Sequence, residues 1–549
     1  MTKKILQLFL IVILLMCTSK SVHAQGVKDT IPADSGTTMH HIEIIYADKQ
    51  GFKKLDSTNS IQILAGKVQV KEDATIFYCD SAVLNKNLKT LEAFGNVHIN
   101  DADSVHTYAQ YLLYHSDTKK AELRKKVKLT DGVSTLTSEE VNYDMNQKIG
   151  EYFNGGKVIA GKSVLTSKEA TYYADLKDVY FKREVVLKDP QYKLYADSLL
   201  YNTESGIATF ISKTLIEDSL HRKIRTKEGF YDQKNKKAFF AKRPVIEDGK
   251  VTVIANEIET DDNTGNNILK GNAVYKDDAQ DITVIANRIE SNKDKETFLA
   301  TQHPLMILKQ EKDSIFITAD SLFSGKLSQL FPVKDSTPVV KKNIKGKPVL
   351  TPKEKKSTDS TDRFFQAYRH VRIFSDSLQA VSDSLFYSSK DSVFRLFNDP
   401  IVWSDENQIT GDTIYLYTKN KKADKLFVNE NALLVNKAAD KMFNQIKGNR
   451  ITGLFTEGAI EKMTAKGNAE SIYYMQDDKD SSFIGMNKAS GDMIEMRFQH
   501  KALQRVVFIS EVKGTIHPIK QIPDTEKELK GFQWQIHRRP KNKFELIGE

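Results

Sequence analysis

The chain has 549 residues, of which 40% are hydrophobic and 28% charged, and its formal net charge is +9. Nine lysines against four acids lie in the segment 326–362, so much of the basic excess belongs to one stretch and the rest is nearly balanced. This distribution argues against a nucleic-acid-binding protein and is typical of a solvated, highly charged surface.

Residues 1–24 have the features of a signal peptide. Lys3 and Lys4 form a charged start, residues 5–16 an apolar stretch, and Ala24 ends a plausible cleavage site. We therefore expect an exported, periplasmic protein. Cys17 leaves open a lipid-modified cysteine, although the large Met16 before it disfavours this alternative.

A short N-terminal segment, 25–59, precedes a repeated pattern of one small residue, two polar residues and one apolar residue. Cys79-Asp80-Ser81-Ala82 and Ala196-Asp197-Ser198-Leu199 are two of about thirteen copies, spaced mostly about 29 residues apart. Internal repetition of this kind is typical of proteins built from stacked supersecondary units.

Two apolar columns accompany the pattern, one two residues before the small residue and one three residues after it. Alternation along a strand places the first column and the small residue on one face, but the odd offset to the second column breaks the alternation. The polar pair therefore predicts a bulge or corner at which the strand bends. The predicted inner columns contain Phe77, Leu112, Leu136, Val141, Leu165, Leu194, Leu199, Ile224, Val253, Ile258, Val284, Ile289, Ile317 and Leu322.

Turns and new strands follow each corner, as in Gly95-Asn96-Val97 and Arg243-Pro244-Val245. Each copy is thus predicted to contain about two bent strands and a hairpin. The fold class that follows is all-β, with repeated antiparallel strands stacked into an elongated body.

The repeats are interrupted once. They are expected over 60–325 and again over 363–518, and the intervening 326–362 contains four of the twelve prolines and many Lys, Ser and Thr residues, as a flexible loop would. The last segment, 519–549, is predicted to be a basic tail.

No catalytic motif accompanies the repeats, so we expect neither an enzyme nor a cofactor or metal site. Corner acids recur in several copies, which favours a structural role over calcium ligation or glycosidase chemistry; they are Asp80, Asp197, Asp320, Asp383 and Asp412. Cys79 is interpreted as a small core residue, and His40-His41 as a solvated pair.

Two kinds of segment carry a family resemblance: the strands Leu64-Ala65-Gly66-Lys67-Val68 and Ala93-Phe94-Gly95-Asn96-Val97-His98-Ile99, and the corner Tyr195-Ala196-Asp197-Ser198-Leu199-Leu200-Tyr201. Together they resemble the OstA-like family, which includes LptA and the periplasmic domain of LptD. The resemblance covers about 60–516. It implies a V-shaped β-jelly roll whose apolar groove holds the acyl chains of lipopolysaccharide, with the inner columns as lipid contacts.

The same resemblance implies strand-edge pairing with LptC-like and LptD-like jelly rolls, or head-to-tail pairing between copies of the chain. The chain lacks the C-terminal barrel of LptD, so we interpret it as a periplasmic bridge to the outer membrane. Two alternatives stay open: a structural or surface β-solenoid or adhesin with a closed core and no lipid, and a polysaccharide-active enzyme on a β-helix.

Overall fold

A computed structural model describes residues 42–56, 59–101, 105–310, 314–330, 339–342, 348–351, 362–419, 422–456, 459–477, 479–499 and 502–547. The predicted signal peptide, Cys17 and His40-His41 lie outside these residues. In the described ranges, no helix has the length and apolar character needed to cross a membrane.

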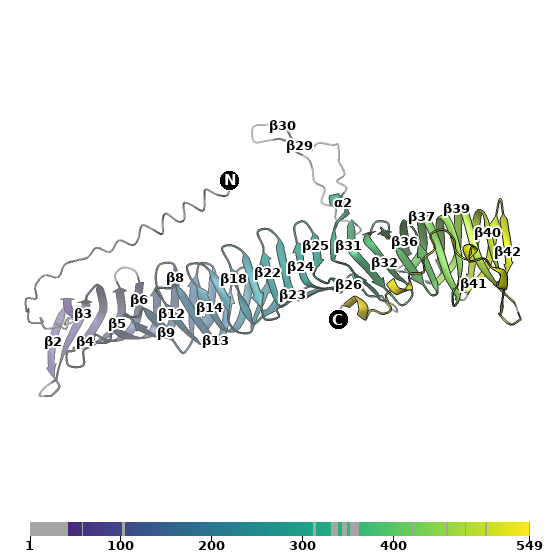
Figure 1. Ribbon diagram of the computed structural model, residues 1–549. Helices are drawn as coiled ribbons and strands as arrows, with labels where there is room; N and C mark the ends of the chain where they lie inside the picture. The colour runs from purple at the N-terminus through teal and green to yellow at the C-terminus, as the bar shows by residue number, and fades with distance from the viewer. Residues whose placement is uncertain are drawn as a thin grey trace, which may run out of the picture.

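Forty strands form one sheet that runs along an elongated molecule (Figure 1), and every pairing is antiparallel where the register is given. The first strands are β1 (Glu43–Tyr46), β2 (Lys49–Lys54), β3 (Ser60–Glu72), β4 (Thr75–Asn85), β5 (Thr90–Asp101), β6 (Val105–His115), β7 (Lys120–Thr130), β8 (Ser134–Asp144), β9 (Ile149–Tyr152), β10 (Gly156–Ala160), β11 (Ser163–Ser167), β12 (Glu169–Tyr173), β13 (Asp178–Lys188) and β14 (Tyr192–Asn202).

The middle of the sheet contains shorter strands. They are β15 (Ile207–Phe210), β16 (Thr214–Asp218), β17 (Lys223–Thr226), β18 (Glu228–Asp232), β19 (Lys237–Ala241), β20 (Val245–Asp248), β21 (Val251–Ile254), β22 (Glu257–Asp261), β23 (Asn266–Asp277), β24 (Ile282–Asn292), β25 (Thr297–Thr301), β26 (Leu305–Leu308), β27 (Ile315–Thr318) and β28 (Ser321–Lys326).

After the helix α2 (Leu327–Leu330), β29 (Val339–Lys342) and β30 (Pro348–Thr351) pair only with each other among the described strands. The main sheet then continues through β31 (Arg363–Phe374), β32 (Gln379–Ser388), β33 (Val393–Phe397), β34 (Ile401–Ser404), β35 (Asn407–Thr410), β36 (Thr413–Lys419), β37 (Lys422–Ala439), β38 (Met442–Thr456), β39 (Ala459–Gln476), β40 (Phe483–Gln499), β41 (Ala502–Ile509) and β42 (Lys513–Pro518). The predicted all-β fold of stacked antiparallel strands is confirmed.

Each repeat bends at a corner, at the polar pair that the sequence marks. β3 pairs with β4 from Ile61 to Ala65 and again from Val68 to Glu72, so Gly66 and Lys67 both lie opposite Asp80. Both bulged residues have positive φ, 83° and 47°. Two residues opposite one, with a left-handed glycine first, form a β-bulge that turns the strand.

The corner residues repeat one hydrogen bond along the stack. The amide of the polar residue donates to the carbonyl of a bulged residue on the neighbouring strand, as in Asp48→Gly66, Lys168→Arg183, Asn256→Gly271, Asn287→Gln302, Asp320→Arg369, Asp383→Asn398, Asp412→Glu430 and Asp492→Ser510.

Corner side chains add to this bond. Asn96 donates to Asp80 at 2.9 Å, and Asn431 donates to Asp412 at 3.0 Å. A Cβ on Gly95 would lie 2.4 Å from Asp80 Oδ2 and would displace this carboxylate, and the φ of 72° at Gly95 also favours glycine. These contacts support the structural interpretation of the corner acids.

The corner divides the body into two arms. Arm A contains segments such as 90–94 of β5 and 111–115 of β6, and arm B contains 97–101 and 105–108 of the same strands. In much of the middle the corner interrupts the strand, so β15 and β16 belong to different arms. One apolar core cluster extends from Leu64 to Phe498 between the arms.

Residues 519–547, which we call the strap, lie along the outer face of arm B. The strap contains η1 (Ile519–Gln521), η2 (Asp524–Glu526), η3 (Ile536–Arg538) and α3 (Phe544–Ile547). It returns from β40 toward β27 and β31, as the yellow segment over the green strands shows (Figure 1). The segment that the sequence marks as a basic tail is therefore packed against the sheet over its described length.

Three glutamines on alternate strands of the outer face bind the strap. Gln445 Nε2 donates to the Lys527 carbonyl at 2.8 Å and Gln408 Nε2 to the Gln533 carbonyl at 2.7 Å, while Gln379 Oε1 accepts from Arg539 at 2.8 Å. Below the strap the outer face is apolar and fully buried, with Trp403, Val435, Ile472 and Met486 at 0% exposure.

Candidate functional site

The inner face of arm A carries one apolar row that crosses the strands in register. At about 4.8 Å between strands, this row extends on the order of 120 Å. Its members include Leu64, Ala82, Ala93, Leu112, Leu123, Val141, Phe181, Leu199, Phe210, Phe240, Ile258, Leu269, Ile289, Ala300, Leu322, Ala367, Leu385, Leu396, Ile414, Val428, Ile451, Ala465, Ile494 and Phe508.

Gly229 interrupts this row between Phe210 and Phe240. Its φ is 143°, and a Cβ there would lie 2.0 Å from the Phe239 carbonyl oxygen, so no other residue fits without moving the backbone. The rings of Phe210 and Phe240 stack across the gap with centroids 6.0 Å apart, which fills the space that the missing side chain leaves.

Arm B carries a second inner row that faces the first. It includes Val70, Phe77, Ile99, Leu129, Leu136, Val158, Leu165, Leu187, Leu194, Ile216, Ile224, Ile246, Val253, Tyr275, Val284, Met306, Ile317, Ile373, Ala380, Val402, Ile409, Leu434 and Ile446.

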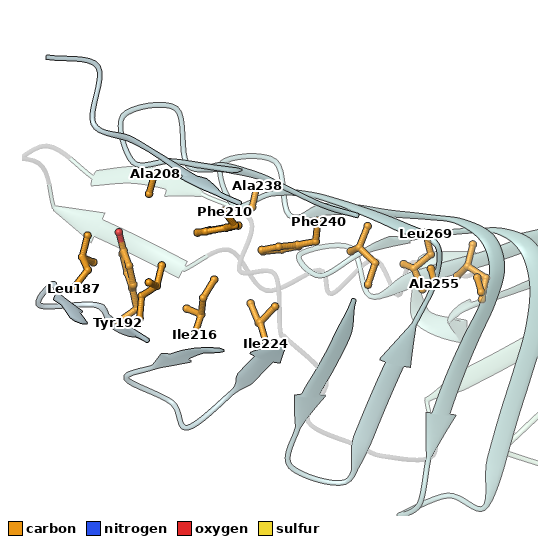
Figure 2. Close-up of a cluster of buried hydrophobic side chains, with 14 of the residues drawn as sticks. Leu187, Tyr192, Ala208, Phe210, Ile216, Ile224, Ala238, Phe240, Ala255 and Leu269 are labelled. Atoms are coloured by element: carbon orange, nitrogen blue, oxygen red, sulfur yellow. The ribbon is translucent and has the colours of Figure 1, made fainter. Parts of the chain in front are cut away.

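The two rows pack against each other. Ile216 and Ile224, on the hairpin of β16 and β17, point toward Phe210 and Phe240 of arm A (Figure 2). Aromatic rings meet across the arms in three places, with centroid distances of 4.9 Å for Phe77–Tyr114, 5.3 Å for Tyr192–Tyr231 and 5.1 Å for Tyr275–Phe298.

The fourteen residues predicted for the groove all lie on these two rows. Phe77, Leu136, Leu165, Leu194, Ile224, Val253, Val284 and Ile317 belong to arm B, and Leu112, Val141, Leu199, Ile258, Ile289 and Leu322 to arm A. All are at most 8% exposed except Val253, which is half-buried. The arms therefore fill the interior with their own side chains.

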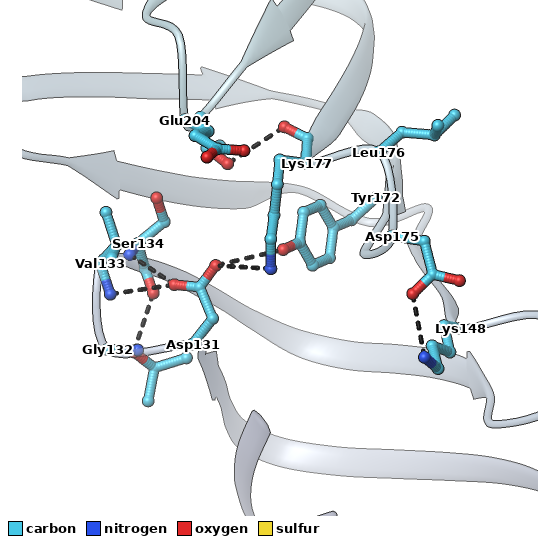
Figure 3. Close-up of polar contacts among 12 residues, drawn as sticks. Asp131, Gly132, Val133, Ser134, Lys148, Tyr172, Asp175, Leu176, Lys177 and Glu204 are labelled. Atoms are coloured by element: carbon cyan, nitrogen blue, oxygen red, sulfur yellow. Dashed lines mark hydrogen bonds and ion pairs between the residues drawn. The ribbon is translucent and has the colours of Figure 1, made fainter. Parts of the chain in front are cut away.

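Polar contacts join the tips of the arms on the side opposite the corner, and we call them latches. Asp131, on a hairpin tip of arm B, accepts hydrogen bonds from the amides of Ser134 at 2.7 Å and Val133 at 3.0 Å. From arm A, Tyr172 donates to the same carboxylate at 3.3 Å and Lys177 lies 3.8 Å away (Figure 3).

Two further latches flank this one. Toward the N-terminus, Tyr114 of arm A donates to the buried Glu72 of arm B, and Lys119 pairs with Asp73 at 2.5 Å. Toward the C-terminus, Gln233 of arm A donates to the Tyr192 hydroxyl at 2.7 Å and lies 3.4 Å from Asp189.

Burial and the contacts in the latches together shift the pKa values of Tyr114, Tyr172 and Asp131 away from neutral pH. Burial, followed by the bond to Glu72, raises the pKa of Tyr114, and burial raises the pKa of Tyr172 as well, so both hydroxyls remain donors. Burial alone would raise the pKa of Asp131, but the bonds from Ser134 and Val133 and the charge of Lys177 outweigh it and lower that pKa.

The sequence interpretation missed the latches. Tyr114 and Tyr172 belong to an aromatic column that lies five residues after the small residue of the repeat. Their polar partners Glu72 and Asp131 lie about forty residues earlier in the chain, on the other arm, and the spacing within one strand does not reveal them.

Both ends of the sheet have strands with one unpaired edge among the described strands. β2 pairs with β3 and β42 with β40. All six residues of β2 are exposed, and Phe52 and Ile516 show 71% and 64% exposure. Unpaired edges with apolar side chains can accept another strand.

Comparison with known proteins gives a family match for the first part of the chain. The model of the "OstA-like protein" family matches residues 39–197 and 183–256. No curated protein sequence matches. Among solved structures, the chain is similar to LptH of Pseudomonas aeruginosa, described as the LptA homologous periplasmic component of the conserved lipopolysaccharide transport device. The identity is 19% and the TM-score 0.20, with 26% of this chain and 95% of that chain covered.

Proposed function

We propose that the chain, whose residues 39–256 match the OstA-like family, is a periplasmic bridge that carries lipopolysaccharide between its two arms toward the outer membrane. The observation that supports this proposal most is the pair of inner apolar rows, which face each other along the body from the first full repeat to the last. A transport path for acyl chains needs such continuity.

The proposed transport of acyl chains needs no chemical step, because burial of methylene groups supplies the free energy of binding. Each methylene moved from water to an apolar site gains about 0.8 kcal/mol. Because the rows already bury each other, acyl chains have to replace contacts between the arms. The arms would move apart about their shared corner, and the latches on the opposite side would open.

The strands at the two ends of the sheet, each with one unpaired edge among the described strands, complete the proposal. β1 and β2 at one end and β41 and β42 at the other would pair with jelly rolls of LptC-like or LptD-like partners, or with another copy of the chain. Edge pairing would extend the inner rows from one protein into the next.

The burial of most residues in the two rows also favours a second candidate function. Leu112, Leu165 and Leu199 are 0% exposed because side chains of the two arms cover them, as in an ordinary closed core. On this alternative, the protein is a structural spacer or surface solenoid that binds no lipid.

Photo-crosslinking in cells distinguishes the two candidates. A photo-reactive residue is placed at Leu199 or Ile289, on the inner row, and at Leu200 or Glu290, the next residues along the same strands, which face outward. Lipopolysaccharide adducts at the inner positions and none at the outer ones are expected for the bridge. Equal labelling, or none at the inner positions, would overturn it in favour of the spacer.

A further inference from the structure

The outer face of arm B carries an apolar row of its own, which is shifted by one residue along each strand relative to the inner row. Its members are paired across neighbouring strands and are, in order, Val186, Tyr195, Leu215, Arg225, Val245, Ile254, Val274, Ile285 and Leu305. We call the part from Val186 to Ile285 the outer track. Arg225 is the one charged residue on it.

The same row continues under the strap. Beyond Leu305 it passes through Thr318 and Arg372 to Val381, Ile401 and Leu433, which are 7%, 0% and 3% exposed. An extended segment that crosses the strands therefore covers this part of the row.

The strap shows what holds such a segment in place. Apolar side chains such as Leu529, which is 4% exposed, enter the outer face, and side-chain amides of the sheet bind its backbone. Opposite charges pair along its length, with Arg538–Asp399 at 2.5 Å and Arg372–Glu545 at 3.0 Å.

The outer track lacks a cover in the described part of the chain. Tyr195 and Ile285 are 40% and 37% exposed, and Val186, Leu215 and Val245 are half-buried. An apolar row of this kind on a solvent-exposed surface, interrupted only by Arg225, marks an interaction site.

The charge beside the track indicates what would bind there. A hollow of about 820 Å³ has Val186, Tyr195, Leu215 and Val245 on its floor. Its lining includes five cations and two acids. Arg225 and Lys242 pair with Glu247 and Glu228, and the acid Glu184 pairs with Lys168. The remaining lining charges are the cations Lys213, Lys227 and Arg243 and the acid Asp197, so the hollow keeps a positive excess. A segment with acidic residues would complement this hollow.

We propose that the outer track is the docking site of an extended acidic and apolar segment of a partner polypeptide, which lies across the strands as the strap does further along the same row. Continuity with the strap-covered row gives the geometry of the bound segment, and the cationic hollow gives its charge. The proposal concerns the outside of arm B and does not depend on what the interior holds.

Photo-crosslinking with identification of the product tests the proposal. The photo-reactive residue replaces Leu215 or Ile285 in the full chain, in the cells that produce it. The controls are Lys193 and Thr283, which lie on the same outer face but two residues further from the corner than Tyr195 and Ile285 of the track. We expect adducts of one partner protein at both track positions, with tryptic fragments that map to one segment containing apolar and acidic residues.

A charge variant sharpens the test. The double variant Lys213→Glu with Lys227→Glu reverses two exposed cations without touching the inner rows. A synthetic peptide with the crosslinked sequence should bind the purified chain about tenfold more weakly when the variant is used. Lipid adducts, adducts to a second copy of this chain, equal labelling at Lys193 and Thr283, no adduct at all, or peptide affinity unchanged in the charge variant would each overturn the proposal.

Discussion

Replacing Asp131 by alanine should release the central latch between the arms. The side chain of Asp131 is only 9% exposed, and its carboxylate accepts from two backbone amides and from the Tyr172 hydroxyl. Each hydrogen bond to a charged group contributes about 1.5–3 kcal/mol, and a buried hydroxyl without a partner costs about 1–3 kcal/mol. Since Lys177 at 3.8 Å is partly exposed, its ion pair adds little.

These contributions are not additive, and we expect a local destabilisation of about 3 kcal/mol. A long repeat protein does not unfold as one unit, so the effect is measured as local opening rather than as one melting temperature. By hydrogen exchange, amides of 170–181 in arm A should exchange about two orders of magnitude faster in the variant.

Two controls separate the latch from local turn effects. Asp131→Asn keeps an acceptor oxygen for the amides and should lose less protection, whereas Asp117→Ala, at an exposed tip of arm A, should change little. If only the hairpin 131–134 exchanges faster in Asp131→Ala and the arm A amides do not, the reasoning is refuted, because the contact would then stabilise its own turn and not the closure of the arms.

The wild-type latch should also depend on pH. Because the pKa of Asp131 is lower in the folded protein than in the unfolded chain, its contribution is complete above the unfolded value of about 4. It decreases as the pH falls through the folded pKa. Exchange in arm A should therefore accelerate in acid, and in the Asp131→Asn variant this acceleration should be smaller.

Three further outcomes follow from the structure. Gly229→Ala should lower the local stability measured by hydrogen exchange by more than about 3 kcal/mol, because its Cβ would lie 2.0 Å from the Phe239 carbonyl oxygen. The control Gly161→Ala has open space around it and should cost about 1 kcal/mol, so equal effects would contradict the packing argument. Gln408→Ala should make the strap accessible to limited proteolysis, because it leaves the Gln533 carbonyl and the Gln535 amide without their bonds at 2.7 Å; an unchanged cleavage rate would show that the apolar contacts suffice. Cys79 should resist alkylation at pH 8 in the native protein and react readily in denaturant, because burial raises its pKa to about 12; rapid native alkylation would mean that the arms open readily at this repeat.

Local periodicity was enough to predict the strands and their corners. Alternation at period two decides which side chains share a face, and the odd offset at the polar pair indicates where the face changes. All fourteen predicted groove residues lie on the two inner rows for this reason. Whether lipid enters between those rows stays a prediction, since both an occupied groove and a closed core need the same apolar columns.

The place of the strap is a second feature that the sequence did not predict. Its basic composition suggested a tail, whereas the residues that indicate its binding site lie in β34 and β37. Ile401-Val402-Trp403 and Leu433-Leu434-Val435 are continuous apolar runs without alternation, as in strands that are buried on both faces. Such runs indicate that something covers the outer face without indicating which segment does so.

The sequence by itself determined the repeat, the bent strands, the inner columns and the structural place of the corner acids, because each depends on residues within one or two strands. Only the tertiary structure decided that the arms close on each other, that Tyr172 and Asp131 meet 41 residues apart, and that the last thirty or so residues return to β27 and β31. These contacts are set by how the bent strands stack and by which surfaces remain uncovered after stacking. That information is distributed over the whole chain and is absent from any one repeat.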